Sequence, residues 1–502
     1  MYPHHSQKVA LVQTQMSFIF LTGDYAYKVK KPVNLGYLDY TTLEKRHFFC
    51  QQEIELNRRL CPEVYLEVVP IVESEGRFQL GGNGEVVEYA VKMKQLPAEQ
   101  MMDRLLPSDK VTEEMVTSIA YKLADFHQKA RTSPEISNYG SLHAIKVNTE
   151  ENFSQTEKYV GTSISHHVYS FTKDYTNKFM EEHKELFQKR VAEGRIRDCH
   201  GDLHAAHVCF TNGICIYDCI EFNDRFRYGD VASEVAFLAM DLDRFNRADL
   251  SRVFVDAYVQ ASGDKELLKL LAFYKCYRAY VRGKVESFKL DDPFIADKDT
   301  ALEAARSYFR LAYRYARGKK LLFIVAGLVG TGKTTVAQAL GRSLGLTVIS
   351  SDIVRKELAG IPPTERRFEP ISSGIYSEEF TRRTYQEMFT RAKSLLLQGG
   401  SVIMDASFKQ RQHRLEAKKL AEAMDADFAV LECVLDEPTV KNRLEQRVKE
   451  GSVSDGRWEV YLAQKDEFEK IDEIPSQQHI VLDTAQQMSN IVTIVARRLW
   501  GE

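Results

Sequence analysis

The stretch Gly327–Thr334 reads GLVGTGKT and matches the pattern G-x-x-x-x-G-K-[ST] in full. The apolar segment LLFIVA (321–326) precedes it, and the helical pattern TTVAQALGRSLG (334–345) follows. Glycines at such a turn let backbone N–H groups surround phosphate oxygens at the start of a helix. This stretch therefore predicts a nucleotide-binding loop that opens an α/β domain with a parallel sheet.

The side chains of this loop have distinct expected roles. Lys333 is expected to reach the β- and γ-phosphates and to act in catalysis, and the Thr334 hydroxyl is expected to bind Mg²⁺. A glycine-rich turn that binds nothing is the structural alternative. Nucleotide contacts are expected from seven positions: Gly327, Gly330, Thr331, Gly332, Lys333, Thr334 and Thr335.

Polar residues follow the later apolar strands of this region. Asp352 and Arg355 come after VIS (348–350), Asp405 ends SVIMD, and Arg443 and Arg447 follow a further strand and turn. The arrangement resembles the small P-loop kinases that include gluconate and adenylylsulfate kinases and the kinase domain of polynucleotide kinase.

That resemblance assigns roles to these residues. It implies that Asp352 accepts the proton of the substrate hydroxyl, that Arg355 holds an anionic substrate group and that Asp405 supports Mg²⁺. Arg443 and Arg447 would act in catalysis by neutralising charge on the transferred phosphoryl group. A helix cap for the aspartate and a solvated surface for the lid arginines remain alternatives.

A second motif lies in the first part of the chain, where Cys199–Val208 reads CHGDLHAAHV. Protein-kinase-like catalytic loops carry H-x-D and a metal-binding Asn five residues after the Asp. Here His200 and Asp202 fit, but position 207 is His. A hairpin pattern follows and ends at Asp218, where such folds place a Mg²⁺-binding aspartate.

The run HGDLH, IYDCIEF, RYGDVASEVAFL resembles the aminoglycoside and choline phosphotransferase group. The resemblance implies a bilobal, protein-kinase-like α+β domain with Asp202 as catalytic base, Asp218 as metal ligand, and Asp230 and His200 in structural roles. His207 would stand where Asn normally binds the second metal. Three readings stay open for it: weak metal binding, a preference for Mn²⁺, or only a hydrogen bond nearby.

The small lobe offers a lysine and an acidic partner for the nucleotide phosphates. Lys28, with Lys30 as alternative, lies in a strand pattern within 16–32, and Glu53, with Glu55 as alternative, lies in the helical pattern 42–60. No G-x-G-x-x-G loop precedes them. Nucleotide binding is expected from Lys28 and Glu53.

Two further features have open interpretations. Lys275, Arg278 and Arg282 share one helical face, so Arg278 and Arg282 either bind an anionic substrate or belong to a solvated charged stripe. A zinc site is the rival explanation of the histidine-rich loop, since tetrahedral zinc needs four ligands. Its candidates are Cys199, His200, His204, His207, Cys209, Cys215 and Cys219.

Composition and length limit the remaining possibilities. The 502 residues carry 68 basic and 71 acidic side chains, a net charge of -3, which gives no reason to expect a general nucleic-acid or membrane binder. We expect residues 1–317 to form the kinase-like domain (small lobe about 1–97, large lobe about 98–317) and 318–502 the P-loop domain. No signal peptide or membrane span is evident, and the eight cysteines are expected to be reduced, buried thiols of a cytoplasmic protein.

The combined layout resembles bacterial proteins described as bifunctional aminoglycoside phosphotransferase/ATP-binding proteins. It implies two separate sites for ATP (or another NTP) and Mg²⁺ (or Mn²⁺), each phosphorylating a hydroxyl of a small molecule, sugar-like or aminocyclitol-like. One alternative is a nucleotide sensor or scaffold with a non-catalytic first domain. Another is a second domain that phosphorylates nucleic-acid 5′-hydroxyls. The sequence leaves the acceptors and the oligomeric state open.

Overall fold

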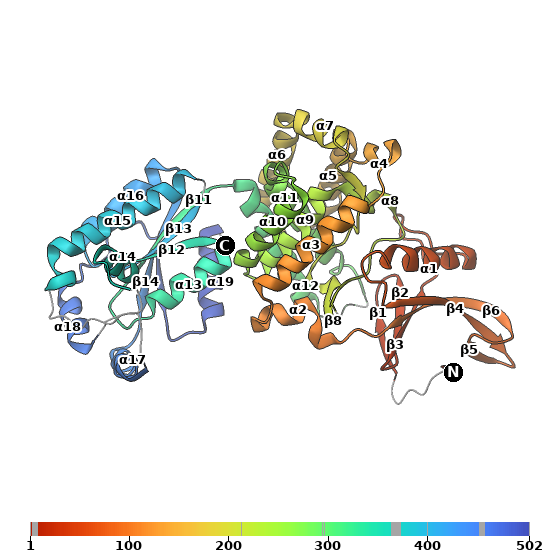
Figure 1. Cartoon of the computed structure of the whole chain (residues 1–502), viewed down its shortest axis with the longest axis horizontal. Helices are drawn as coiled ribbons and strands as arrows, with labels where there is room; N and C mark the ends of the chain where they lie inside the picture. Colours follow the sequence, from red (N-terminus) through yellow and green to blue (C-terminus); the bar gives the residue numbers. More distant parts are fainter. Residues whose placement is uncertain are drawn as a thin grey trace. The chain divides into compact units, whose positions relative to one another are not determined.

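The computed structural model describes residues 2, 9–211, 213–293, 295, 297–362, 373–398, 400–450 and 457–500. The chain divides into two compact units (Figure 1). The first comprises Met1–Phe245 and Leu250–Arg317, and the second comprises Gly318–Glu502 together with Asn246–Asp249. The first unit is a bilobal α+β domain, and the second is an α/β domain.

The first unit begins with a small lobe, a six-stranded antiparallel sheet in the order β1-β2-β3-β6-β4-β5. The strand pattern expected within 16–32 is observed as two strands, β2 and β3, joined by a turn in which the Thr22 hydroxyl donates to the Tyr25 carbonyl. Helix α1 packs on β4 and β6, and the hydroxyl of the preceding residue, Thr42, caps its start by accepting the Lys45 N–H. The bounds are β1 Ala10–Gln13, β2 Ser17–Leu21, β3 Tyr25–Lys30, α1 Leu43–Asn57, β4 Tyr65–Ser74, β5 Arg77–Leu80 and β6 Glu85–Lys94.

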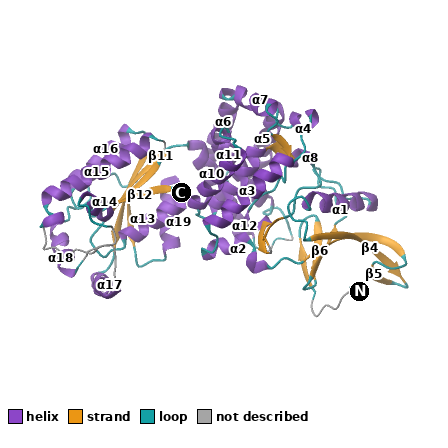
Figure 2. Cartoon of the chain, viewed as in Figure 1, coloured by secondary structure: helices purple, strands orange, loops and turns teal. Residues whose placement is uncertain are grey.

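The large lobe is mainly helical, as Figure 2 shows by the change from strands to helices. Helix α9 lies in its core, with residues 231–243 all buried, and packs against α11. Two short antiparallel pairs, β7 with β10 and β8 with β9, lie around the expected catalytic loop. The strands are β7 Ile196–Asp198, β8 Val208–Thr211, β9 Gly213–Ile216 and β10 Tyr228–Asp230. The helices are α2 Met102–Leu105, α3 Glu113–Lys129, α4 Pro134–Asn138, α5 Leu142–Thr156, α6 His166–Glu182, α7 Lys184–Ala192, α8 Asp224–Arg227, α9 Val231–Arg244, α10 Ala248–Ser262, α11 Leu267–Phe288 and α12 Lys298–Arg317.

The second unit is built on a five-stranded parallel sheet in the order β12-β13-β11-β14-β15. Alternate residues of β11 face two cores, one covered by α13 and α19 and the other by α14, α15 and α16. This explains the continuous apolar run of β11, because both faces of the strand are buried. The strands are β11 Lys320–Ala326, β12 Leu346–Ser350, β13 Ser401–Asp405, β14 Ala426–Val434 and β15 His479–Asp483. The helices are α13 Lys333–Leu344, α14 Ser351–Leu358, α15 Glu378–Leu397, α16 Arg411–Ala423, α17 Glu437–Glu450, α18 Trp458–Glu467 and α19 Met488–Trp500.

The expectation of eight reduced thiols is wrong for two cysteines. Cys61, which follows α1, forms a disulfide with Cys215 of β9, although 154 residues separate them in sequence. The other six are free and buried, as expected. The pair has no characteristic spacing because only the fold brings its two segments together.

Within the described residues, none of the helices combines the length and the apolar character needed to cross a membrane.

Candidate active sites

The loop Gly327–Gly332 joins β11 to α13 at the point where the sheet continues on both sides of β11. Ligands of open α/β sheets bind at the carboxyl ends of strands at such a switch point. Gly327 has φ +139°, and a Cβ there would lie 2.6 Å from the Cys433 carbonyl oxygen, so this position admits only glycine. Gly332 caps α13 with φ +87°, which directs the first N–H groups of the helix toward the loop.

The polar side chains of this loop are held in place by neighbouring groups. The Thr334 hydroxyl donates to Asp405 Oδ2 at 2.7 Å, and Lys333 Nζ donates to the Leu328 carbonyl at 2.8 Å. Asp405 is buried at the end of β13, and burial raises its pKa. A carboxylate and a hydroxyl oxygen are the donor types that Mg²⁺ prefers, so this pair fits the expected metal.

The remaining expected nucleotide contacts lie in the same region. Thr331 is buried and donates its hydroxyl to the Leu328 carbonyl at 2.8 Å. Gly330 has φ +85°, and Thr335 is exposed in the first turn of α13. The sequence did not point to Thr484, whose hydroxyl donates to the Thr331 carbonyl at 2.7 Å and supports the loop.

The residues of the second unit that are expected to act in catalysis or to bind substrate differ in their burial and in their contacts. Asp352 is half-buried in the first turn of α14, close enough to Asp405 for their charges to interact. Arg443 lies beside the loop, 3.5 Å from a Cβ built on Gly332. Arg355 is buried, donates to the Ile375 carbonyl at 2.7 Å, and has a buried Nε without a hydrogen-bond partner among the described residues. The side chain of Arg447 lies outside the described residues.

We expect Gly327→Ala to lower the free energy of unfolding by about 1–3 kcal/mol, because its φ is open essentially to glycine. Nucleotide binding at this loop should weaken as well, since the Cβ would meet the Cys433 carbonyl. Chemical denaturation and equilibrium binding of a non-hydrolysable ATP analogue measure both effects. Gly360→Ala is the matched control, because Gly360 has φ +67° but a Cβ there meets nothing within 4 Å. Equal losses in the two variants would contradict the role given to Gly327.

In the first unit, Lys28 lies between two carboxylates. Its Nζ is 2.8 Å from Glu53 Oε1 on α1 and 2.8 Å from Asp218 Oδ1 beyond β9. Burial alone would lower the pKa of Lys28, but Asp218 and Glu53 more than reverse this and leave it well above its ordinary value. The ammonium therefore stays charged, as binding of phosphate oxygens requires.

Lys30 and Glu55, the alternative residues for this ion pair, lie in different surroundings. Lys30 Nζ contacts Glu53 Oε2 at 2.6 Å and also pairs with Glu221, and it is buried. Glu55 is exposed on α1. Of the candidates, Lys28 and Glu53 are the pair that also meets Asp218.

The expected catalytic loop places Asp202, His207 and Asp218 together. His207 Nδ1 is 3.6 Å from Asp202 Oδ2, and His207 Nε2 is 3.5 Å from Asp218 Oδ2. Burial would raise the pKa of Asp202, but His204 and His207 outweigh it and hold that pKa well below the ordinary value. Asp218 has φ +63°, an uncommon conformation for a residue with a side chain and one that occurs at functional sites.

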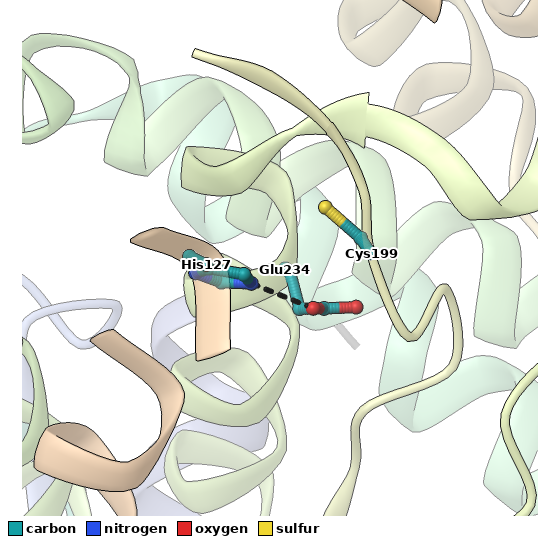
Figure 3. Close-up of side chains that lie close together, drawn as sticks. All are labelled: His127, Cys199 and Glu234. Carbon is teal, nitrogen blue, oxygen red and sulfur yellow. Dashed lines mark hydrogen bonds and ion pairs between the residues drawn. The ribbon is translucent and has the colours of Figure 1, made fainter. Parts of the chain in front are cut away.

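The backbone of the loop is held by Glu234 of α9, which the sequence did not identify. Its Oε1 accepts hydrogen bonds from the N–H groups of His200 at 2.9 Å and Gly201 at 2.6 Å. On its other side, Glu234 Oε2 lies 2.8 Å from His127 Nε2, and Figure 3 shows this pair beside Cys199. The sequence signal for this role is one charged residue, Glu234, inside the otherwise apolar segment VASEVAFLAM (231–240). A charge buried at such a position needs a partner.

Asp230, for which a structural role is expected, is buried and pairs with a buried guanidinium. Asp230 accepts two hydrogen bonds from Arg190, at 2.6 and 2.9 Å, and caps α9 by accepting the Ala232 N–H. These contacts join Arg190 of α7 to the start of α9 and fit the structural role expected for Asp230. His200, also expected to have a structural role, is fully buried, and its ring bonds to the Tyr217 carbonyl.

The two arginines expected to bind substrate, Arg278 and Arg282, make different contacts. Arg278 donates to the Gly201 carbonyl at 3.1 Å and to the Ser233 hydroxyl at 3.0 Å, so its described contacts support the loop. Arg282 is near enough to Asp202 to lower its pKa, and its buried Nε has no hydrogen-bond partner among the described residues. Arg282 Nη2 also donates to Glu286 Oε1 at 3.3 Å one turn along α11, so its role in substrate binding stays a prediction.

The zinc alternative finds little support in the geometry. Among the described residues, the metal-capable clusters near this loop are His127–Cys199–Glu234 and Asp202–His204–His207, each with three members. In the first, both ring nitrogens of His127 are already engaged, by Tyr258 and Glu234. Cys215, one of the proposed ligands, is bonded to Cys61.

We expect Glu234→Gln to cost about 3 kcal/mol of unfolding free energy near pH 7. Burial would raise the pKa of Glu234, but the bond from His127 outweighs it and lowers the pKa from 4.5 to about 2. A depressed carboxyl pKa contributes stability that is complete above pH 4.5 and is lost as the pH falls toward 2. Denaturation of both proteins across pH 7 to 2.5 should show the gap closing in that window. Parallel curves would contradict this account of Glu234.

Two family models match the chain. The model described as "Phosphotransferase enzyme family" covers residues 50–274, and the model described as "AAA domain" covers residues 322–471. The uncharacterized protein Rv2004c of Mycobacterium tuberculosis is 31% identical over 452 residues, which are 90% of this chain and 88% of the relative. Uncharacterized protein Mb2027c of Mycobacterium bovis gives the same values. The chain belongs to the same family as these mycobacterial proteins.

In this chain the match to the phosphotransferase model lies essentially in the first unit, and the match to the AAA domain model lies in the second. Solved structures resemble parts of this chain with low TM-scores and low sequence identity. A choline/ethanolamine kinase family protein from Mesorhizobium loti is 12% identical, covers 63% of this chain and 94% of its own, and has a TM-score of 0.39. A gluconokinase from Sinorhizobium meliloti is 19% identical, covers 36% and 91%, and has a TM-score of 0.26. The family assignment rests on the family models and the mycobacterial relatives.

Proposed function

We propose that this protein is a bifunctional kinase with two separate active sites, one in each unit. Each site would transfer the γ-phosphoryl group of ATP, or another NTP, to a hydroxyl of a small molecule. The observation that carries the proposal is the position of Lys28, whose Nζ is 2.8 Å from both Glu53 and Asp218. Kinases of this type need the lysine–glutamate pair and the metal-binding aspartate in place at the same time.

In the first unit, Lys28 would bind phosphate oxygens, while Asp202 accepts the proton of the acceptor hydroxyl. The new bond forms between that hydroxyl oxygen and the γ-phosphorus, and the bond from the γ-phosphorus to the β–γ bridging oxygen breaks, which releases the nucleoside diphosphate. The loop positions Asp202 for this step, with its Oδ2 3.6 Å from His204 Nε2 and 3.6 Å from His207 Nδ1. Arg282 would face an anionic part of the acceptor.

In the second unit, the backbone N–H groups of Gly330, Gly332 and their neighbours would surround the phosphates, with Lys333 at the β- and γ-phosphates. Asp352 would accept the proton of the second acceptor hydroxyl, and Arg443 would neutralise charge on the transferred group. Arg355 would hold an anionic substrate group, and its unpartnered Nε is consistent with that role.

Both units have residues suited to a divalent cation. Asp218 in the first, and Asp405 with Thr334 in the second, present oxygen donors of the type that Mg²⁺ and Mn²⁺ bind. Such a cation, when bound, neutralises phosphate charge and withdraws electron density from the transferred group.

The proposal is tested by incubating the full chain with γ-labelled ATP, a divalent cation and an extract of small metabolites. Label should appear in phosphate monoesters of small alcohols, identified by mass and by release with phosphatase. Label that stays entirely in ATP would contradict the proposal and favour the nucleotide sensor. Label transferred to the 5′-hydroxyl of added oligonucleotides, with a steep dependence on salt, would favour the nucleic-acid alternative.

A further inference from the structure

The large lobe of the first unit contains a cavity of about 390 Å³. Its walls come from α3, from the segment 194–197 around the start of β7, from the first residue of α9 and from the end of α10. Pockets that bind small molecules have volumes of this order. Among the described residues that line the cavity, none is expected to act in catalysis or to bind nucleotide, metal or substrate. The cavity is therefore separate from the two proposed active sites.

Two arginines line this cavity from alternate positions of one extended segment. Arg195 directly precedes β7, and Arg197 lies within it. Side chains two residues apart on an extended chain point to the same side, and Ile196 between them is buried. Both guanidinium groups thus belong to one wall of the cavity.

The charges of these two arginines are only weakly met by protein groups. Arg197 donates to two backbone carbonyl oxygens, at 2.8 and 2.9 Å, and these acceptors carry no net charge. Arg195 has a buried Nε without a hydrogen-bond partner among the described residues. Its contacts with Glu193 at 3.8 Å and with Asp264 at 3.9 Å are longer than hydrogen bonds. An oxyanion in the cavity would provide close, charged acceptors for both guanidinium groups.

The acidic side chains around the cavity do not cancel this positive charge. Asp125, which lines the cavity, pairs with Lys129 at 2.7 Å on the same helix. Asp264, which lies near Arg195, accepts two hydrogen bonds from Arg190 at 2.6 and 2.7 Å. Because each of these carboxylates already has a close cationic partner, the excess charge on the wall is positive.

The rest of the lining suits the carbon body of a small organic molecule. Tyr121 is 46% exposed on α3 and offers part of an aromatic surface. Tyr258 is buried and is fixed by a bond of 2.8 Å between its hydroxyl and His127 Nδ1, and both residues line the cavity. His127 is in turn bonded to Glu234 (Figure 3). Apolar surface comes from Ala124, Val231 and Ala261.

We propose that this cavity is a further ligand site of the first unit, and that it binds a small organic anion through Arg195 and Arg197. The anionic group would be a carboxylate or a phosphate, because a guanidinium binds either of them with paired hydrogen bonds. The tyrosines and the apolar side chains would contact the carbon body. This site does not rest on the proposed function, since its lining takes no part in the transfer steps described above.

The test uses the full chain with a saturating non-hydrolysable ATP analogue and Mg²⁺, which keep anionic probes away from the phosphate-binding residues of both units. Isothermal titration calorimetry then compares three probes that share one ring: benzoate, phenyl phosphate and the neutral benzyl alcohol. We expect one site per chain for at least one of the two anions and no measurable binding of benzyl alcohol. The anion that binds more tightly shows whether the site takes carboxylates or phosphates.

Two variants place the binding in this cavity. Arg195→Gln should weaken binding of the anion about tenfold or more, because it removes a charge-assisted hydrogen-bond donor. Gln128→Glu adds a negative charge at an exposed residue of the lining and should also weaken binding, with no change in the buried core. Arg306→Gln on α12 is the matched control, since it alters the net charge equally at an exposed arginine outside the lining and should keep the wild-type affinity.

The inference is overturned if neither anion binds, if benzyl alcohol binds as tightly as the anions, or if either folded cavity variant keeps the wild-type affinity. An equal loss of affinity in Arg306→Gln would also overturn it, because net charge alone would then explain the effect. Weakening confined to Arg195→Gln and Gln128→Glu supports the site, whether or not phosphoryl transfer is found. If Arg195→Gln does not fold, Gln128→Glu decides the question.

Discussion

Asp202→Asn is expected to lower the turnover of the first site by about 10²–10⁴-fold, the contribution usual for a positioned general base. The amide is isosteric with the carboxylate, so the fold and the nucleotide contacts of Lys28 should persist. The apparent affinity for nucleotide should therefore change little while kcat falls. Steady-state kinetics with a substrate of the first site measure this split.

Two results would count against this role for Asp202. A variant that keeps full turnover would show that another group accepts the proton. A variant whose loss is only in nucleotide KM would make Asp202 a binding residue. Thermal unfolding of the same preparation separates both results from a loss of folded protein.

Lys333→Ala is expected to lower the turnover of the second site by about 10²–10³-fold, the range found when one preorganised donor to a developing charge is removed. Lys333 opens α13, and its Nζ contacts the Leu328 carbonyl across the loop. Its removal should weaken nucleotide binding as well as transfer, because its charge faces the phosphates in both states. Binding of an ATP analogue and single-turnover transfer measure the two effects.

Each of these variants is the control for the other. Asp202 and Lys333 lie in separate compact units, so a change in one should leave the kinetics of the other site within experimental error. Loss of both activities on changing either residue would contradict two independent sites.

The local motifs were predictable because their chemistry depends on residues close together in sequence. The turn GLVGTGKT between an apolar strand and a helix predicted both the loop and the α/β unit that contains it. The hairpin pattern that follows the H-x-D motif and ends at Asp218 likewise predicted a strand pair, now seen as β8 and β9.

Contacts between distant segments were not predictable in the same way. Glu234 supports the loop from α9, and Arg278 does so from α11, because packing of these helices brings them beneath Gly201. A helical spacing shows that Arg278 and Arg282 share a face but not what that face meets. The disulfide Cys61–Cys215 is another contact that the sequence did not predict, because it joins segments 154 residues apart.

The central claim is that one chain contains two independent phosphoryl-transfer sites, and product analysis of four full-length proteins tests it most directly. Wild type, Asp202→Asn, Lys333→Ala and the double variant are incubated with γ-labelled ATP and the same metabolite extract. The account predicts two classes of labelled alcohol phosphate in the wild type, a different one missing in each single variant, and neither in the double variant. A single class of product that disappears in both single variants, or labelled products that persist in the double variant, would contradict it.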